Sequence, residues 1–237
     1  MVIKHDLSDI KEVIQKAMDN PLMRMVRSNS ANLLRFFSPI LGTMGKIGNG
    51  LLSEYSEFKL SCLLMGLASG LNVETRMNEL YLYVNTSQSN AIHVADLLSK
   101  TIYSGSPMIC VIYGLVLARH INPPTELTYE EMIMCKALEN ATDYDLRNFK
   151  EIADNYLVRK TNGRRVELPD GFAKMDAYKS TCDWCVYNRI FVSKMADRED
   201  MPDQELDLTL HYYEEKPAVV LLDNINDARQ VWDYCHG

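Results

Sequence analysis

Residues 158–168, VRKTNGRRVEL, mark the place where the pattern of this sequence changes. The pair Asn162-Gly163 stands between two short arms of polar and apolar residues, which is typical of a β-hairpin turn. Before this stretch, apolar residues recur every three or four positions, the spacing of helices that bury one face. The sequence therefore predicts a mainly α fold: an all-helical, bundle-like body over residues 1–157, followed by a smaller α+β module over residues 158–237.

The predicted body contains several local helix signals. Ser106 can cap a helix and Pro107 suits its first position, and the apolar run that follows predicts a helix buried on all sides. Thr128 with Glu131 three residues later has the pattern of a capping box. Asp143 is predicted to cap the next helix. Apolar spacing predicts further helices over residues 7–17, 32–37, 54–68, 73–84 and 89–103.

The predicted module is more varied. One long helix is expected over residues 172–194, and the alternation of Leu206, Leu208, Leu210 and Tyr212 predicts a half-buried strand. The run AVVLL, residues 218–222, is interpreted as the partner of that strand. A last helix is expected to follow, capped by Asn224 or Asn226. A helix, a hairpin and a second helix resemble a winged-helix module in element order alone, which carries little information about function.

Composition narrows the class of protein. Of the 237 residues, 47% are hydrophobic and 24% are charged, as in ordinary globular proteins. The net charge of −7 argues against a surface that is basic throughout, although it leaves room for a local basic patch. The apolar run of residues 107–118 is shorter than the roughly 20 residues that a membrane-spanning helix needs. The polar N-terminus has no signal-peptide pattern, so we expect a cytoplasmic protein without a transmembrane segment.

The only C-x-x-C motif, Cys182 and Cys185, falls on the apolar stripe of the predicted long helix. There Cys behaves as a small hydrophobic residue, and core packing is our interpretation. Two alternatives stay open: a zinc site completed by Cys235 and His236, and a redox pair. The glycine-rich stretch GTMGKIGNG, residues 42–50, departs from the phosphate-binding loop pattern, and the sequence predicts no cofactor.

Charge is distributed unevenly in the C-terminal module. Residues 158–198 contain nine Lys or Arg against five Asp or Glu, whereas residues 199–237 contain two against ten. The basic residues could form an ordinary solvated turn, meet an acidic surface of the same or another molecule, or contact phosphates. The candidate contact residues are Arg159, Lys160, Arg164, Arg165, Lys174 and Lys179.

These observations favour a non-enzymatic regulatory or protein-interaction protein, because charge is segregated and a catalytic motif is lacking. A protein partner is expected, and the two opposite charge blocks could also pair between two copies as a homodimer. One alternative is a DNA-binding regulator that uses the winged-helix-like module. The other is an enzyme whose site is assembled from residues that a single sequence does not reveal.

Overall fold

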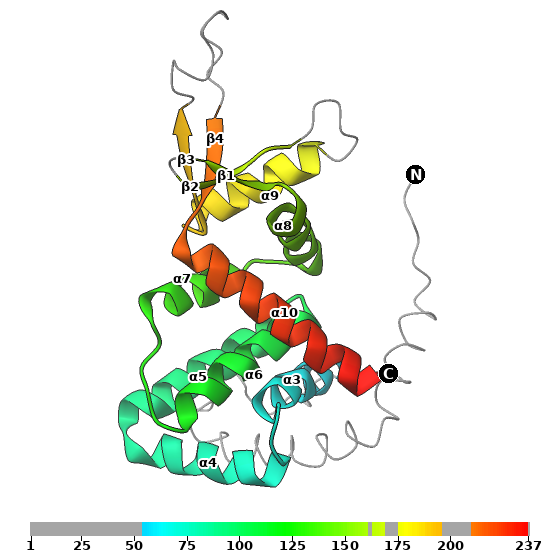
Figure 1. Ribbon diagram of the computed structural model, residues 1–237. Helices are drawn as coiled ribbons and strands as arrows, with labels where there is room; N and C mark the ends of the chain where they lie inside the picture. The colour runs from blue at the N-terminus through cyan, green and yellow to red at the C-terminus, as the bar shows by residue number, and fades with distance from the viewer. Residues whose placement is uncertain (1–53, 161–162, 169–174, 196–209, 237) are drawn as a thin grey trace, which may run out of the picture. The chain divides into compact units, whose positions relative to one another are not determined.

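The computed structural model describes residues 54–160, 163–168, 175–195 and 210–236, and all structural statements below concern these residues (Figure 1). Within them the chain is 71% helical, with eight helices and one small antiparallel sheet of four strands, which confirms the predicted mainly α class. The predicted helices over residues 7–17 and 32–37, the glycine-rich stretch and strand residues 206–209 lie outside the described residues.

The chain divides into two compact units. The first comprises residues 1–126 and 227–237, and the second comprises residues 127–226. The first strand begins at Leu157, next to the predicted change from helical body to α+β module. Whether residues 1–157 and 158–237 are separate domains stays a prediction.

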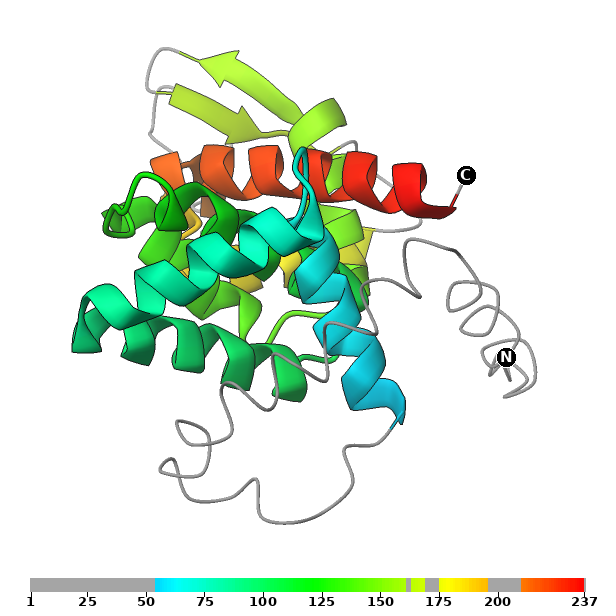
Figure 2. The same cartoon turned by 90° about the horizontal axis from the view of Figure 1, so that it is seen from below.

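The first unit is built around one helix that is almost entirely buried. Its helices are α3 (Glu54–Leu67), α4 (Val73–Thr86), α5 (Gln88–Tyr103) and α6 (Pro107–Ile121), and α4 and α5 lie side by side in both ribbon views (Figures 1 and 2). Helix α6 begins as predicted, because the Ser106 side chain accepts a hydrogen bond from the Ile109 amide and Pro107 is its first residue. Nearly all of its side chains are buried, which confirms the predicted central helix.

Two glycines allow α3 and α6 to approach with their backbones in contact. A Cβ atom on Gly114 would lie 2.0 Å from the Leu63 carbonyl oxygen, and one on Gly66 would lie 2.1 Å from the Val111 carbonyl oxygen. Real Cβ contacts are never this short, so a larger residue at either position would force the two helices apart. The close crossing therefore depends on glycine at both positions.

A buried lysine completes the end of α5. The Lys59 ammonium group donates hydrogen bonds to the carbonyl oxygens of Ile102 and Ser104, the latter at 2.9 Å. Carbonyls at a helix C-terminus have no partner within the helix, and a cation there also interacts favourably with the helix dipole. Burial lowers the pKa of Lys59, an effect opposed by the nearby Cys110. The hydrogen bonds to these two carbonyls therefore compensate for the burial of the Lys59 ammonium group.

The second unit combines helices with the sheet. It contains α7 (Tyr129–Leu138), α8 (Asp143–Asn155), β1 (Leu157–Lys160), β2 (Gly163–Val166), α9 (Met175–Tyr187), β3 (Phe191–Met195), β4 (Leu210–Glu214) and the first part of α10 (Lys216–His236). The capping box of Thr128 and Glu131 is confirmed. The predicted cap of α8 is wrong: Thr142 is the cap and forms a capping box with Asp145, so Asp143 is the first helical residue.

The predicted long helix over residues 172–194 is also wrong, because α9 ends at Tyr187. Arg189 adopts a left-handed conformation with φ of 61°. The Ile190 amide then donates to the Cys185 carbonyl at 2.7 Å, and the Arg189 amide donates to the Val186 carbonyl at 3.0 Å. These two bonds form the Schellman motif that closes many helices. The following residues turn away as strand β3.

The predicted strand over residues 218–222 is instead the start of α10. Ala218, Leu221, Ile225 and Ala228 are buried at helical spacing, so the apolar run AVVLL is one part of a helical stripe. Asn224, which was predicted as a possible cap, lies inside this helix and donates from its side chain to the Val220 carbonyl at 2.7 Å.

The sheet has the strand order β1-β2-β4-β3, and all pairs are antiparallel. The predicted hairpin is confirmed, since β1 and β2 pair from Leu157 with Val166 to Lys160 with Gly163. Strand β4 pairs with β2 and β3 and not with residues 218–222. The elements after α8 follow the order β1, β2, α9, β3, β4, α10, so the predicted helix, antiparallel strand pair and helix occur as α9, β3 with β4, and α10.

Candidate functional site

One face of the sheet carries a row of side chains that crosses all four strands. Val158 pairs with Arg165, Arg165 with Tyr213, and Tyr213 with Val192. Side chains two positions apart on a strand share a face, so further residues lie on the same side. We call this surface the basic sheet face and define it by Val158, Lys160, Arg165, Glu167, Val192, Lys194, His211 and Tyr213.

The opposite face of the sheet packs on the helices of the second unit. Phe191 is 2% exposed, and its ring centroid lies 5.8 Å from that of Phe149 on α8. The Tyr212 hydroxyl donates to the Asp183 carboxylate on α9 at 2.7 Å, and burial together with this bond raises the pKa of Tyr212. The hydrophobic core of the unit is therefore on this side.

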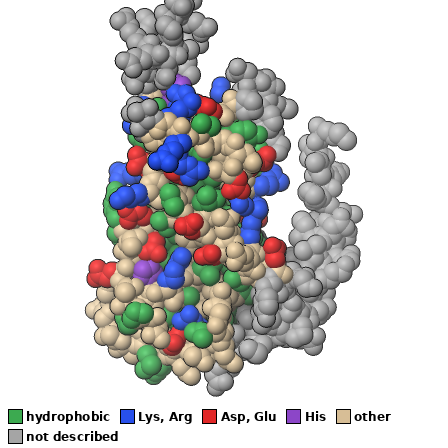
Figure 3. Space-filling view, viewed as in Figure 1, with side chains coloured by type: hydrophobic (Ala, Val, Ile, Leu, Met, Phe, Trp, Pro, Cys, Tyr) green, Lys and Arg blue, Asp and Glu red, His purple; other side chains and the backbone are tan. Residues whose placement is uncertain are grey.

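The basic sheet face is exposed to solvent in part, around a nearly buried aromatic ring and an Arg165 side chain that is only 13% exposed. Val158 is 39% exposed, and Lys160 and Lys194 are also exposed. Tyr213 is only 9% exposed, and the Lys194 ammonium group lies over its ring, 4.9 Å from the centroid. Lys and Arg side chains gather over the strands in the space-filling view (Figure 3). The arrangement is an apolar and aromatic centre bordered by cations.

One carboxylate partly neutralises this face. Glu167 accepts from Lys160 at 2.6 Å and from Arg165 at 2.7 Å. These two hydrogen bonds hold the pKa of Glu167 below its ordinary value. Two cations thus share a single acid, and Lys194 forms no ion pair with a described residue. Counted over its described members, this face carries three Lys or Arg residues and one Glu, in a protein whose overall charge is −7.

The predicted contact residues do not all lie on one surface. Lys160 and Arg165 belong to the basic sheet face. Arg164 lies on the opposite face of β2, where one of its guanidinium nitrogens donates to both carboxylate oxygens of Glu214 of β4, at 2.9 and 3.2 Å. Arg159, on the edge strand, and Lys179, on α9, are exposed, and Lys174 lies outside the described residues.

Six members of the face were not among the predicted contact residues: Val158, Glu167, Val192, Lys194, His211 and Tyr213. Residues 191–195 had been assigned to a helix, which hid the alternation of Val192 and Lys194 on one side of a strand. The sequence did contain a signal. A β-branched residue directly after an aromatic one, as in Phe191-Val192, favours a strand.

The two cysteines of the C-x-x-C motif are core residues, as interpreted from the sequence. Cys182 and Cys185 are both fully buried. Burial raises the pKa of Cys182 to about 12 and that of Cys185 well above its ordinary value, whereas a redox or nucleophilic cysteine needs a stable thiolate. Among the residues that the structure describes, His, Cys, Asp and Glu form no group of three or more that could hold a metal ion. The side chains of Cys235 and His236 are not described, so the zinc alternative is untested.

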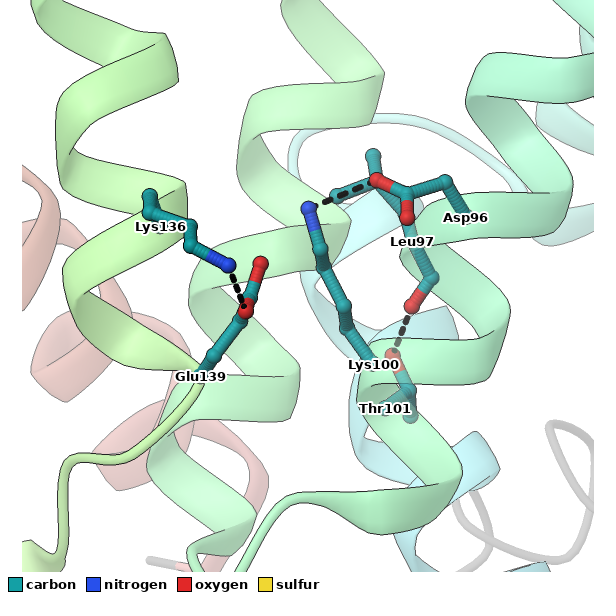
Figure 4. A network of polar contacts seen from close by, with 6 residues as sticks. All are labelled: Asp96, Leu97, Lys100, Thr101, Lys136 and Glu139. Atoms are coloured by element: carbon teal, nitrogen blue, oxygen red, sulfur yellow. Dashed lines mark hydrogen bonds and ion pairs between the residues drawn. The ribbon is translucent and has the colours of Figure 1, made fainter.

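Two further ion pairs lie on α5 and at the end of α7 (Figure 4). On α5, Lys100 and Asp96 form an ion pair at 2.6 Å, next to the bond from the Thr101 hydroxyl to the Leu97 carbonyl. On α7, Lys136 and Glu139 pair at 2.6 Å. Such pairs contribute about 0.5 kcal/mol or less each. They explain helix stability and do not form a binding site.

Comparison of the chain with protein-family models, with curated proteins and with solved structures finds no match. In the described part of the chain, every helix is too short or too polar to cross a lipid bilayer. Among the described residues, the basic sheet face is the surface with the clearest chemical character.

Proposed function

We propose that this chain is a non-enzymatic interaction protein that acts by binding another protein, and that the basic sheet face contacts an acidic region of this partner. The observation that carries the proposal is the cluster of Lys160, Arg165 and Lys194 around Tyr213, with Glu167 as the one acid of the face. Protein interfaces are rich in Tyr and Arg, and charge complementarity speeds association and selects partners.

Nucleic acid is the weaker of the two candidate ligands. In the DNA-binding alternative, α9 would be the recognition helix of the winged-helix-like module, and its exposed side presents Asp176 and Asp183 together with Lys179. A recognition helix lies against phosphates, which repel carboxylates. Glu167 on the basic sheet face would also be repelled by phosphates. An acidic protein surface with a few well-placed carboxylates fits these charges better than a continuous polyphosphate.

A charge-reversal experiment tests the proposal. The double variant Lys160→Glu/Lys194→Glu changes the sign of the face at two exposed positions, and Lys179→Glu on α9 is the matched control. Tagged wild-type and variant chains are used to capture proteins from cells, and the recovered proteins are compared by quantitative mass spectrometry. We expect one acidic partner to be lost at least tenfold from the double variant and retained by the control.

The partner is then purified and its affinity is measured against each variant. Equal affinity of wild type and double variant would overturn the proposal, provided that circular dichroism shows both to be folded. A labelled random DNA duplex, followed by fluorescence anisotropy across a salt series, tests the alternative. Micromolar binding that weakens steeply with salt would favour the DNA-binding regulator instead.

The homodimer suggested by the opposite charge blocks is a separate proposal with its own measurement. Contacts between exposed opposite charges weaken as salt screens them. Sedimentation at about 50 mM and about 500 mM salt is therefore expected to show a dimer that dissociates at the higher concentration. A monomer at both concentrations would remove the homodimer.

A further inference from the structure

Strand β1 has an edge that no described strand covers. It stands at one end of the order β1-β2-β4-β3, so β2 pairs with one side of it only. Residues at a sheet edge present unpaired amide and carbonyl groups, which are a template for an added strand. Val158, Arg159 and Lys160 are all exposed, so side chains do not cover this edge as they would in a buried strand.

The two basic residues of β1 point to opposite sides of the sheet. Lys160 belongs to the basic sheet face, and Arg159, as its neighbour along the strand, lies on the other face. Arg159 forms no ion pair with any residue that the structure describes. A strand laid along β1 would therefore place its alternate side chains next to a cation on both faces.

The other edge of the sheet is less suitable. Strand β3 begins at the nearly buried Phe191, directly after the closing motif of α9, and the residues that follow Met195 are not described. A second copy of β1 is also a poor occupant. Pairing β1 with itself would bring Arg159 and Lys160 of one copy close to the same residues of the other, and like charges on neighbouring strands are destabilising.

Basic residues on an edge strand have another established effect, which is to prevent pairing between sheet edges. The same charges that repel a basic or neutral strand attract one that carries carboxylates. Strand addition is a recurrent mode of peptide recognition in which main-chain hydrogen bonds give affinity and alternate side chains give specificity. The charges of β1 thus select among strands by their chemistry.

We propose that an extended acidic segment of the protein partner adds to β1 as a fifth strand, with carboxylates beside Arg159 and Lys160. This inference rests on the proposed function and adds the mode of binding. A peptide bound in this way would contact the edge of β1 and, through Lys160, the basic sheet face at the same time.

A peptide with a modified backbone tests the inference. The probe is a labelled octapeptide that alternates Glu with Thr. It is compared with two N-methylated versions of the same peptide, one methylated at the odd-numbered residues and the other at the even-numbered residues. N-methylation removes amide donors and leaves the side chains in place. We expect the N-methylated peptide of one register to bind about tenfold more weakly, as loss of two hydrogen bonds implies. In nuclear magnetic resonance spectra, alternate amides of residues 157–160 should gain protection from hydrogen exchange when the unmodified peptide binds.

Two variants separate this inference from the proposed function. Arg159→Glu should weaken the unmodified peptide about tenfold, and Lys179→Glu is the matched control. If the peptide binds and Lys160→Glu/Lys194→Glu abolishes binding, but N-methylation has no effect and the β1 amides gain no protection, the face binds acids and strand addition is refuted. If the unmodified peptide fails to bind at millimolar concentration, strand addition is refuted as well. The proposed function is then still decided by the capture experiment.

Discussion

Replacement of Gly114 by Ala is the sharpest test of the packing described for the first unit. In an ordinary helix interior this change stabilises a protein by about 1 kcal/mol, because Ala is the better helix former. Here the new Cβ would meet the Leu63 oxygen at 2.0 Å and the Leu67 nitrogen at 2.7 Å, whereas ordinary contact begins at 3.4 Å. Both atoms belong to the backbone of α3, so rotation of a side chain cannot relieve the clash.

The two helices must therefore separate by more than an ångström, which loosens the packing along their whole contact. Overpacking of a core costs about 1–3 kcal/mol, and a backbone clash belongs at the upper end of that range. After subtraction of the helix-propensity gain, we expect Gly114→Ala to lower the free energy of unfolding by about 2 kcal/mol. For a chain of this size the melting temperature should fall by about 4–8 °C.

Urea unfolding followed by far-ultraviolet circular dichroism measures this change. Gly105→Ala is the control, because a Cβ atom at that loop position meets no atom within 4 Å. It should change stability by no more than about 0.5 kcal/mol. The double variant Gly66→Ala/Gly114→Ala should lose less than the sum of the single losses, since one separation of the helices relieves both clashes. A Gly114→Ala protein as stable as the wild type would refute the close crossing.

Three further predictions follow from the second unit. Burial raises the pKa of Cys182 to about 12, so the buried thiol contributes fully to stability below the ordinary thiol pKa of about 9, and this contribution is lost as the pH rises towards 12. Between pH 8 and pH 11, the free energy of unfolding in urea should therefore fall less steeply for Cys182→Ala than for the wild type. Thr142→Ala removes the α8 capping box and should cost about 1 kcal/mol in the same assay at neutral pH, and an unchanged midpoint would contradict the cap. Arg164→Ala breaks an ion pair in which Arg164 is 42% exposed and Glu214 only 10% exposed. Because the guanidinium is well exposed, the loss should stay near or below about 1 kcal/mol and become smaller in high salt, and a larger loss would show that the Glu214 carboxylate behaves as a buried charge.

The sequence predicted the helices between residues 54 and 155 because their signals are local. The Ser106-Pro107 start and the Thr128 capping box each depend on residues within one turn of the helix, so the rest of the fold need not be known. The one error there, Asp143 for Thr142, is a shift by one position between two residues that both make good caps.

The sequence failed where a short apolar run suits both a helix and a strand. AVVLL has only five residues, and its helical partners Ile225 and Ala228 come after the polar residues that suggested a new start. The run around Phe191 continued an apparent helical stripe, because the positive φ of Arg189 that ends α9 is not signalled by a glycine. In both cases tertiary packing decided between the alternatives.

The candidate site could be predicted only in part, for a related reason. Charge counting found the basic stretch around the hairpin, but the pairing of β2 with β4 joins residues that are far apart in the sequence. Arg164 meets Glu214, fifty residues later, so part of the apparent charge segregation is satisfied within the molecule. A pair between residues so far apart cannot be predicted from a local sequence pattern.

That pairing also sharpens the functional argument. If the basic stretch only balanced the acidic stretch of its own chain, each basic residue of the sheet would face an acid across the strands. Arg164 does so with Glu214, on the face that packs against the helices. On the other face Lys160 and Arg165 share Glu167, and Lys194 rests on Tyr213. Among the residues of the sheet that the structure describes, the exposed cations without an ion pair to another described residue are therefore Lys194 and Arg159. An acidic partner that partly excludes water from this side would increase the direct attraction between its carboxylates and Lys160, Lys194 and Arg159, a gain that must exceed the cost of removing these charges from water.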